Sequence, residues 1–182
     1  KLNHFHSHSH RVGVFLVWTE ETTQAPLRLP EPFTNARTTQ NRPRTARLTY
    51  DWTISASALN QFFAGATRFL ETGESRAANQ GWPDRIGLAG VNRGPGNAFP
   101  VVTFNDGYEP WGASTAGRSV GGQTDNTVQL ADHLSLLRGR HAFKLGADVR
   151  WMQTNGEEWL WNQGRFSFSS FTTALPTTQG RT

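Results

Sequence analysis

Residues 127–152, TVQLADHLSLLRGRHAFKLGADVRWM, form two runs of alternating character that are joined at residues 138–140. Successive side chains of a β-strand point to opposite faces, so each run predicts a strand with one apolar and one polar face. Each run has about ten to twelve residues, which exceeds the usual length of a soluble strand and approaches the length that crosses a bilayer when tilted. The stretch therefore predicts a hairpin of membrane-spanning strands.

The two faces of this hairpin are expected to meet different surroundings. In a membrane barrel the apolar side chains point to lipid and the polar side chains point into the lumen. We expect the lipid-facing residues to be Val128, Leu130, Leu134, Leu136, Phe143, Leu145, Val149 and Trp151, with Asp132 interrupting the row. We expect the lumen-facing residues to include Lys144, Asp148 and Arg150, together with Arg47 of an earlier strand.

Similar but weaker alternation predicts further strands before and after the hairpin. Aromatic residues lie where the two interfacial girdles of a barrel would be, with Trp18 and Trp151 toward the long connections and Tyr50 and Trp52 near a short one. Outside the hairpin, the expected strands are residues 2–5, 11–22, 45–53, 60–70 and 164–170.

The connections between these strands alternate in length. Outer-membrane barrels show this rhythm, with short turns at the periplasmic end and long loops outside, whereas structureless loops of about 50 residues are rare in compact soluble domains. The predicted fold is therefore an all-β antiparallel meander of long strands, forming part of a transmembrane β-barrel with long extracellular loops. The short connections are expected at residues 7–10, 54–58 and 138–140, and the long ones at 23–44, 71–125 and 153–163.

Composition excludes several other classes of protein. The longest apolar run, residues 12–18, is far shorter than the ~18 residues of a transmembrane helix. The net charge of +4 is spread along the 182 residues without a basic cluster, so no nucleic-acid partner is expected. The chain has no cysteine, which excludes disulfides and thiolate metal sites. Because it starts at Lys1 without Met and stops in a polar segment, we expect it to be a piece of a larger protein.

The sequence offers little for catalysis or metal binding. His4, His6, His8 and His10 would share one face of a strand, but they fall where a short, solvated turn is expected. Asp132 and His133 are adjacent, so on a strand they face opposite sides and cannot act as a dyad. We therefore expect a protein that is not an enzyme and that has no catalytic residues, metal site or cofactor.

The longest connection is the best candidate for ligand binding. It carries aromatic residues together with positive charge, a combination that suits a sugar, a peptide or an anionic chelate. The alternative is that these aromatic side chains only pack the loop against itself. The candidate residues are Trp82, Arg85, Tyr108, Trp111 and Arg118.

Several motifs resemble one family, the TonB-dependent receptors, and within it the Oar-like outer-membrane proteins, which carry a carboxypeptidase-regulatory-like domain before the barrel. The most specific motif is residues 126–150, which resemble a hairpin that this family repeats with little change. The resemblance covers nearly the whole chain. The other matching motifs are GWPD at 81–84, GLAGV at 87–91, FP at 99–100, TF at 103–104, GY at 107–108, LTYDWTIS at 48–55 and GRFSF at 164–168.

The resemblance implies that residues 1–182 are part of a large barrel, of about 22 strands in related transporters, in the outer membrane of a Gram-negative bacterium. The plug, the N-terminal domain and the remaining strands would lie outside this chain. The implied partners are outer-membrane lipid, the TonB complex through the plug, and an unidentified extracellular ligand that is imported or sensed. Two alternatives remain: a surface protein for adhesion or structure that uses the barrel as an anchor, and a soluble secreted β-sandwich that binds glycans.

Overall fold

The computed structural model describes the chain except residues 92–95, 106, 113–117, 161 and 174–182, and the side chains of residues 118–119, 158–160 and 172–173. The chain divides into two compact units. The strand unit comprises residues 1–21, 41–70 and 123–155, and the loop unit comprises residues 22–40, 71–122 and 156–182.

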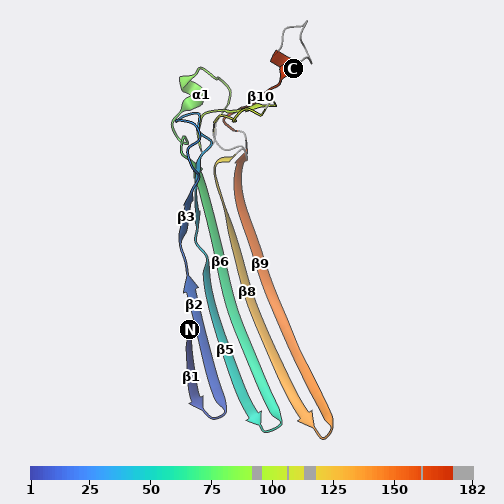
Figure 1. The fold of residues 1–182 in the computed structure, drawn as a ribbon. Helices are drawn as coiled ribbons and strands as arrows, with labels where there is room; N and C mark the ends of the chain where they lie inside the picture. Colours follow the sequence, from blue (N-terminus) through green and yellow to red (C-terminus); the bar gives the residue numbers. More distant parts are fainter. Residues whose placement is uncertain (92–95, 106, 113–117, 161, 174–182) are drawn as a thin grey trace. The chain divides into compact units, whose positions relative to one another are not determined.

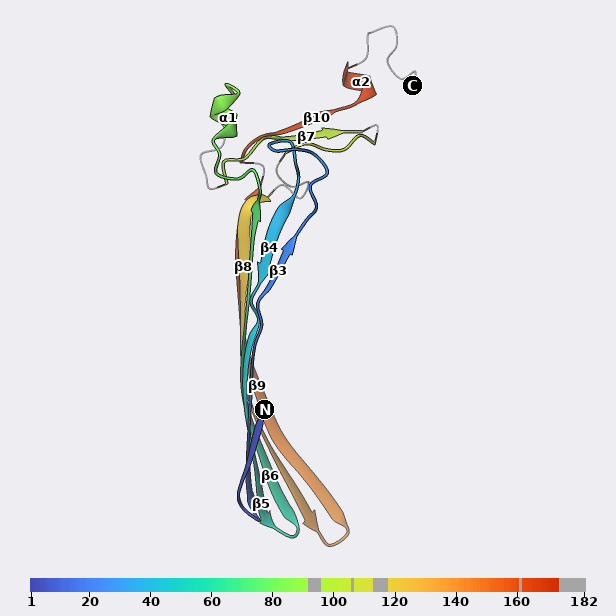
Figure 2. The same cartoon turned by 60° about the vertical axis from the view of Figure 1, so that its left-hand side comes forward.

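Six strands form a meander in which each strand pairs with the next of the six (Figure 1). Figure 2 shows them as a single layer in the strand unit, with no second layer of the described residues on either face. The all-β prediction is confirmed, although the sheet is not closed into a barrel by the described residues. In order, the strands are β1 (Leu2–Ser7), β2 (His10–Trp18), β5 (Arg44–Ser55), β6 (Ala58–Ser75), β8 (Arg118–Arg138) and β9 (His141–Leu160).

The three predicted short connections are tight turns at the same end of the sheet (Figure 1). They lie at residues 8–9, 56–57 and 139–140, each between two paired strands. In the last of them Gly139 has φ 61°, a left-handed backbone conformation that glycine adopts without steric cost. The turn residues thus fix the register of the hairpins, and with it the faces on which the side chains lie.

The predicted strand at residues 11–22 is interrupted. β2 ends at Trp18, and a short strand β3 (Glu21–Gln24) follows and pairs with β4 (Arg37–Asn41). The break lies beside Pro43, whose carbonyl oxygen accepts a hydrogen bond from the Thr19 amide at 3.1 Å. Proline has no N–H to donate to a strand ladder, so the pairing is interrupted here.

Three strands are longer than the alternation of the sequence predicts. β6 runs to Ser75, β8 starts at Arg118 and β9 continues to Leu160, all within segments that we expected to be loops. These extensions are mostly polar and do not alternate, as in the segment ETGES at residues 71–75. Backbone pairing holds such segments in a strand without any hydrophobic alternation, so the sequence pattern does not reveal them.

The prediction that residues 164–170 form a further strand of the long sheet is wrong. The segment does not extend the long sheet: β10 (Arg165–Phe168) pairs in parallel with β7 (Val101–Phe104) in a separate two-stranded sheet. The Val101 amide donates to the Gly164 carbonyl at 3.0 Å, which anchors the start of this pairing. The aromatic alternation of this segment therefore serves packing in the loop unit.

The loop unit has a small core of buried side chains, including Ala36, Ala98 and Val101. It also contains two short helices, α1 (Trp82–Arg85) and α2 (Ser170–Thr173). Neither of these helices has the length or apolar character to span a membrane. Most of the large apolar side chains of the strand unit are instead exposed on one face of the sheet, whereas Phe5, Val17, Leu137 and Met152 are exposed on the other.

One glycine of the loop unit yields a testable prediction. Gly112 has φ 86°, and a Cβ atom at this position would collide with the Pro100 carbonyl oxygen. Gly107 has a similar φ of 80° but open space around it. In both variants the alanine must adopt a left-handed backbone conformation, which costs about 1–2 kcal/mol. Because only the alanine at position 112 also collides with Pro100, we expect Gly112→Ala to destabilise the unit by about 1–3 kcal/mol more than Gly107→Ala.

The measurement is the rate at which a protease cleaves the loop unit of the detergent-solubilised protein, because cleavage follows local opening. Equal rates for the two variants would contradict the close approach of residues 100 and 112.

Candidate functional site

One face of the strand unit is mainly apolar. Direct pairing places Val14 opposite Leu48 and Leu48 opposite Ala64, so these side chains lie on the same side of the sheet. Val128 and Leu130 of β8 line a shallow groove with this row, so they share its face. This is the face that the sequence analysis assigned to lipid.

The same division continues in the hairpin of β8 and β9. Leu145, Val149 and Trp151 are 62%, 67% and 55% exposed, and Phe143 is also exposed. Leu134 and Leu136 are half-buried and lie on the apolar side by the alternation of β8. A sheet in water would bury such a set of side chains, so their exposure needs an apolar surrounding.

The opposite face carries polar contacts between neighbouring strands. The Gln129 side-chain amide donates to the Asp148 carboxylate at 2.7 Å. Lys144 and Arg150 alternate with the apolar side chains of β9 and are exposed on this side. Arg47 also lies on this face, where its guanidinium is 5.8 Å from the centre of the Phe15 ring.

Asp132 and His133 lie on opposite faces, as the alternation requires. The Asn60 side-chain amide donates to the Asp132 carboxylate at 2.8 Å on the apolar side. The His133 ring instead lies where a side chain on Gly146 would be, on the polar side. Asp132 therefore interrupts the apolar row, with Asn60 as its hydrogen-bond donor.

Aromatic rings gather near the short turns of the strand unit. The His10 ring stacks on Tyr50 at 5.9 Å and on Trp52 at 5.8 Å, and its Nδ1 atom lies 2.6 Å from the Tyr50 hydroxyl oxygen. His4 and His6 lie on β1, with ring centres 6.4 Å apart. Within the described part of the chain, no three His, Asp or Glu side chains are grouped to hold a metal ion.

The loop unit contains a connected set of aromatic rings, which we call the aromatic cluster. Its rings meet edge to face in most contacts, at centre distances from 5.1 to 6.2 Å. Such pairs are stabilising beyond the apolar area that they bury. The contacts join Trp82 to Phe99, Phe99 to Phe33, Phe33 to Trp111, Trp111 to Phe104, and Phe104 to Tyr108 and Phe168.

The cluster links three connecting segments that are far apart in the sequence. Phe33 comes from the connection of β3 and β4, Phe168 comes from β10, and the other members come from the connection of β6 and β8. Phe33 was not predicted as part of the candidate site, because ring contacts between separate loops leave no local pattern in the sequence. Phe168 was expected in a further strand at residues 164–170.

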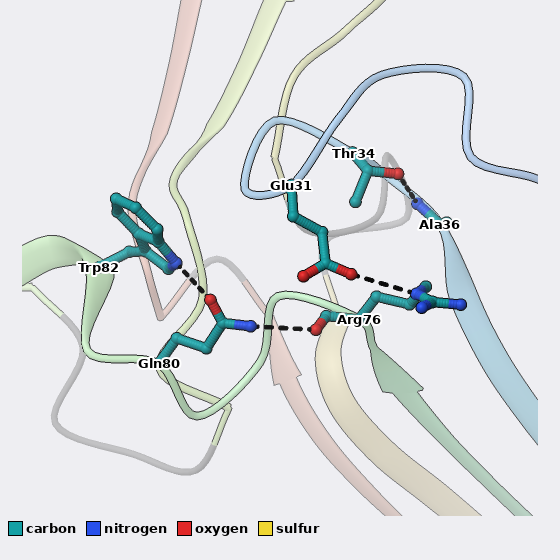
Figure 3. A network of polar contacts seen from close by, with 6 residues as sticks. All are labelled: Glu31, Thr34, Ala36, Arg76, Gln80 and Trp82. Carbon is teal, nitrogen blue, oxygen red and sulfur yellow. Dashed lines mark hydrogen bonds and ion pairs between the residues drawn. The ribbon is translucent and has the colours of Figure 1, made fainter.

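Trp82 is held by polar as well as aromatic contacts. Its indole N–H donates to the Gln80 side-chain oxygen at 2.8 Å, and the Gln80 amide donates to the Arg76 carbonyl at 3.3 Å (Figure 3). The Arg76 guanidinium in turn contacts the Glu31 carboxylate at 3.3 Å. On the ring itself, the Arg85 guanidinium lies 4.0 Å from the centre. Trp82 is therefore a fixed element of the loop unit.

The other end of the cluster is more open. Tyr108 is 70% exposed and Trp111 is 41% exposed, and both contact Phe104. Nearby in sequence, the Glu109 carboxylate accepts from Asn35 at 3.4 Å and pairs with Arg28 at 3.5 Å. These contacts tie the segment around Tyr108 to the loop that carries Phe33.

The structure thus brings four of the five predicted ligand-binding residues into one set of contacts. Trp82, Tyr108 and Trp111 belong to the aromatic cluster, and Arg85 stacks on Trp82. The fifth residue, Arg118, starts β8, and its side chain lies outside the described residues. An exposed tyrosine beside a rigid aromatic support can stack on a sugar ring or an aromatic group.

Comparison with known proteins gives one match. The family described as "Outer membrane beta barrel domain" matches residues 1–181. No curated protein and no solved structure matches the chain significantly. The matched region spans the strand unit and nearly all of the loop unit. The chain belongs to this family, and the protein is an outer-membrane β-barrel protein of a Gram-negative bacterium.

Proposed function

We propose that the chain is the barrel segment of an Oar-like TonB-dependent receptor, which imports or senses an extracellular ligand. The outer-membrane barrel family and the sequence motifs of that receptor group support this proposal. The observation that carries it is the aromatic cluster, since a ligand-gathering surface needs rigid rings on loops that open to the outside. Energised uptake would need the TonB complex, acting through a plug outside this chain.

The apolar face of the strand unit is proposed to contact the hydrocarbon of the membrane. Its large side chains are exposed, while the other face carries Arg47, Lys144, Asp148 and Arg150. Outer-membrane barrels alternate in this way, with apolar side chains outward and polar side chains in the lumen. In this arrangement the three short turns face the periplasm and the long connections reach the outside.

The exposed end of the aromatic cluster is the proposed ligand surface. Tyr108 and Trp111 offer ring faces or edges to a ligand. Arg85 supplies positive charge at the Trp82 end of the cluster, while the charge of Arg28 is balanced by Glu109. This chemistry suits a sugar, a peptide or an anionic chelate. Trp82 supports the surface from within, since its N–H and its ring are already engaged.

A second candidate is a surface protein that uses the barrel as an anchor for adhesion. It is favoured by the mutual packing of the rings, which would stiffen the loops without any ligand. Energy dependence separates the two functions, because adhesion continues in de-energised cells and TonB-driven uptake stops. The third candidate, a soluble β-sandwich, is overturned by membership of an outer-membrane barrel family.

The lipid-facing assignment predicts unequal effects of a charge on the two faces of β9. Val149→Arg places a guanidinium in hydrocarbon, which costs roughly 2–4 kcal/mol near the midplane. Asp148→Arg changes a neighbouring residue on the polar face and is expected to cost much less. Unfolding of the protein in lipid vesicles measures both variants, and equal losses would show that the faces are assigned wrongly.

The receptor proposal predicts that uptake depends on Tyr108. The assay measures accumulation of labelled peptides, glycans and ferric chelates in cells with and without the protein, before and after the proton gradient is collapsed. At least one compound should accumulate only in energised cells. Tyr108→Ala should raise its half-saturating concentration about fivefold to tenfold, as expected for the loss of one aromatic contact.

The matched control is Phe171→Ala, which removes an exposed aromatic side chain outside the cluster and should leave uptake unchanged. If no compound accumulates in an energy-dependent manner while cells still adhere to surfaces through the protein, the anchor function holds instead.

A further inference from the structure

Two arginines lie side by side on the apolar face of the strand unit. Direct pairing places Arg44 of β5 opposite Trp18 of β2 on one side and opposite Arg68 of β6 on the other. The row continues to Asn126 of β8, whose side-chain oxygen accepts a hydrogen bond from Arg68 at 3.4 Å. A polar row therefore crosses three strands, with Trp18 of β2 beside it, at the end of the apolar face that is remote from the short turns.

Neither arginine has a carboxylate partner among the described residues. Both side chains are exposed, and the neighbouring Glu20 carboxylate is paired with Arg42 at 2.9 Å. Like charges directly opposite each other on paired strands destabilise a sheet. An anion bound between Arg44 and Arg68 would remove this repulsion and would accept hydrogen bonds from both guanidinium groups.

An apolar groove of about 360 Å³ adjoins the two arginines. Its floor is low because Ala46 and Ala66 are small and directly opposite each other, while Leu16 and Val128 flank them. A second groove shares these four residues and continues away from the arginines along the apolar face. The surface thus combines a cationic head site with an elongated apolar channel.

The depth of this row fits a head-group position. Trp18 and the ring stack at His10 mark the two ends of β2, about 26 Å apart along the strand at ~3.3 Å per residue, which is about 20 Å along the membrane normal at a strand tilt of ~40°. The apolar band of an outer-membrane barrel is about 25 Å tall, with an aromatic girdle at each edge. Trp18 is 76% exposed beside Arg44, as expected for a ring at the edge of the hydrocarbon.

We propose that Arg44 and Arg68 bind the phosphate of a phosphorylated glycolipid of the outer leaflet, and that one of its acyl chains lies in the adjoining groove. This inference rests on the proposed function, because it needs the apolar face to contact lipid and the long connections to lie outside. The phosphate accepts charge-assisted hydrogen bonds from the guanidinium groups. The alanine floor receives an acyl chain that an inorganic anion does not have.

The test is native mass spectrometry of the full-length protein, extracted from outer membranes in mild detergent, with retained phosphorylated glycolipid as the readout. We expect the double variant Arg44→Gln, Arg68→Gln to lower retention by at least about tenfold, the factor typical of one charge-assisted hydrogen bond. The matched control, Arg47→Gln with Arg150→Gln, removes the same charge from the polar face and should retain the lipid. Ala66→Phe fills the groove floor and should lower retention while both arginines remain.

Two results would overturn the inference. Retention by the double variant equal to that of the native protein would show that the arginines do not hold the lipid. Loss with the double variant but full retention with Ala66→Phe, together with displacement of the lipid by inorganic phosphate, would indicate a simple anion site. Protease resistance of each variant in detergent confirms that it is folded.

A spin label separates failure of this inference from failure of the proposed function. The chain has no cysteine, so Val149→Cys provides a single labelling position within it, away from the arginines. Strong broadening by oxygen, with none by a water-soluble nickel complex, shows that the face contacts lipid. In that case an unaffected double variant overturns the glycolipid site alone. Broadening by the nickel complex would overturn the lipid-facing assignment and the glycolipid site with it.

Discussion

Hydrogen bonding of the backbone is the constraint on which this structure depends. Hydrocarbon offers no partner to a backbone N–H or carbonyl, so a strand in a membrane must pair with its neighbours. The meander of β1, β2, β5, β6, β8 and β9 meets this requirement. Tight turns join three of its strand pairs, and β2 with β5 and β6 with β8 pair across long connections. Among the described residues, β1 and β9 pair on one edge only, so closure requires further strands at both.

Pairing also decides what the side chains can do. Once the register is fixed, every second residue is committed to the same face, and a single strand can serve lipid and lumen together. The result is visible on β9, where Val149 and Asp148 are neighbours in sequence and lie on opposite faces. It is visible again on β5, where Arg47 lies over Phe15 while the adjacent Leu48 joins the apolar row.

The connecting segments of the loop unit are held together mainly by side chains, through ring contacts and side-chain hydrogen bonds. The aromatic cluster draws Phe33, Trp82 and Phe168 from separate connections. Through Glu109 and Asn35, and through Arg76 and Glu31, polar contacts join the same segments. A surface built in this way can be rigid without being part of the long sheet, which suits a binding role on loops.

Strands could be predicted from the sequence where apolar and polar residues alternate strongly. They could not be predicted where only backbone pairing holds the strand. The hairpin faces and the three short turns were predictable because apolar and polar residues alternate with period two. The extension of β6 to Ser75 was not, because its residues are polar on both faces. The pairing of β10 was also not predictable, because an alternating segment has the same sequence pattern in the long sheet and in the small two-stranded sheet of the loop unit. Of the candidate ligand site, the aromatic residue types were apparent, but the partnership of Phe33 with the long loop was not.

Hydrocarbon is proposed to surround the apolar face of the strand unit. Photolabelling of the intact protein in its own membrane tests this most directly, with a carbene precursor dissolved among the acyl chains and adducts located by mass spectrometry. We expect adducts on Phe143, Leu145, Val149 and Trp151, and none on Lys144, Asp148 and Arg150, a pattern with the period of the strand. Adducts spread evenly over both sets, or confined to the polar set, would contradict it.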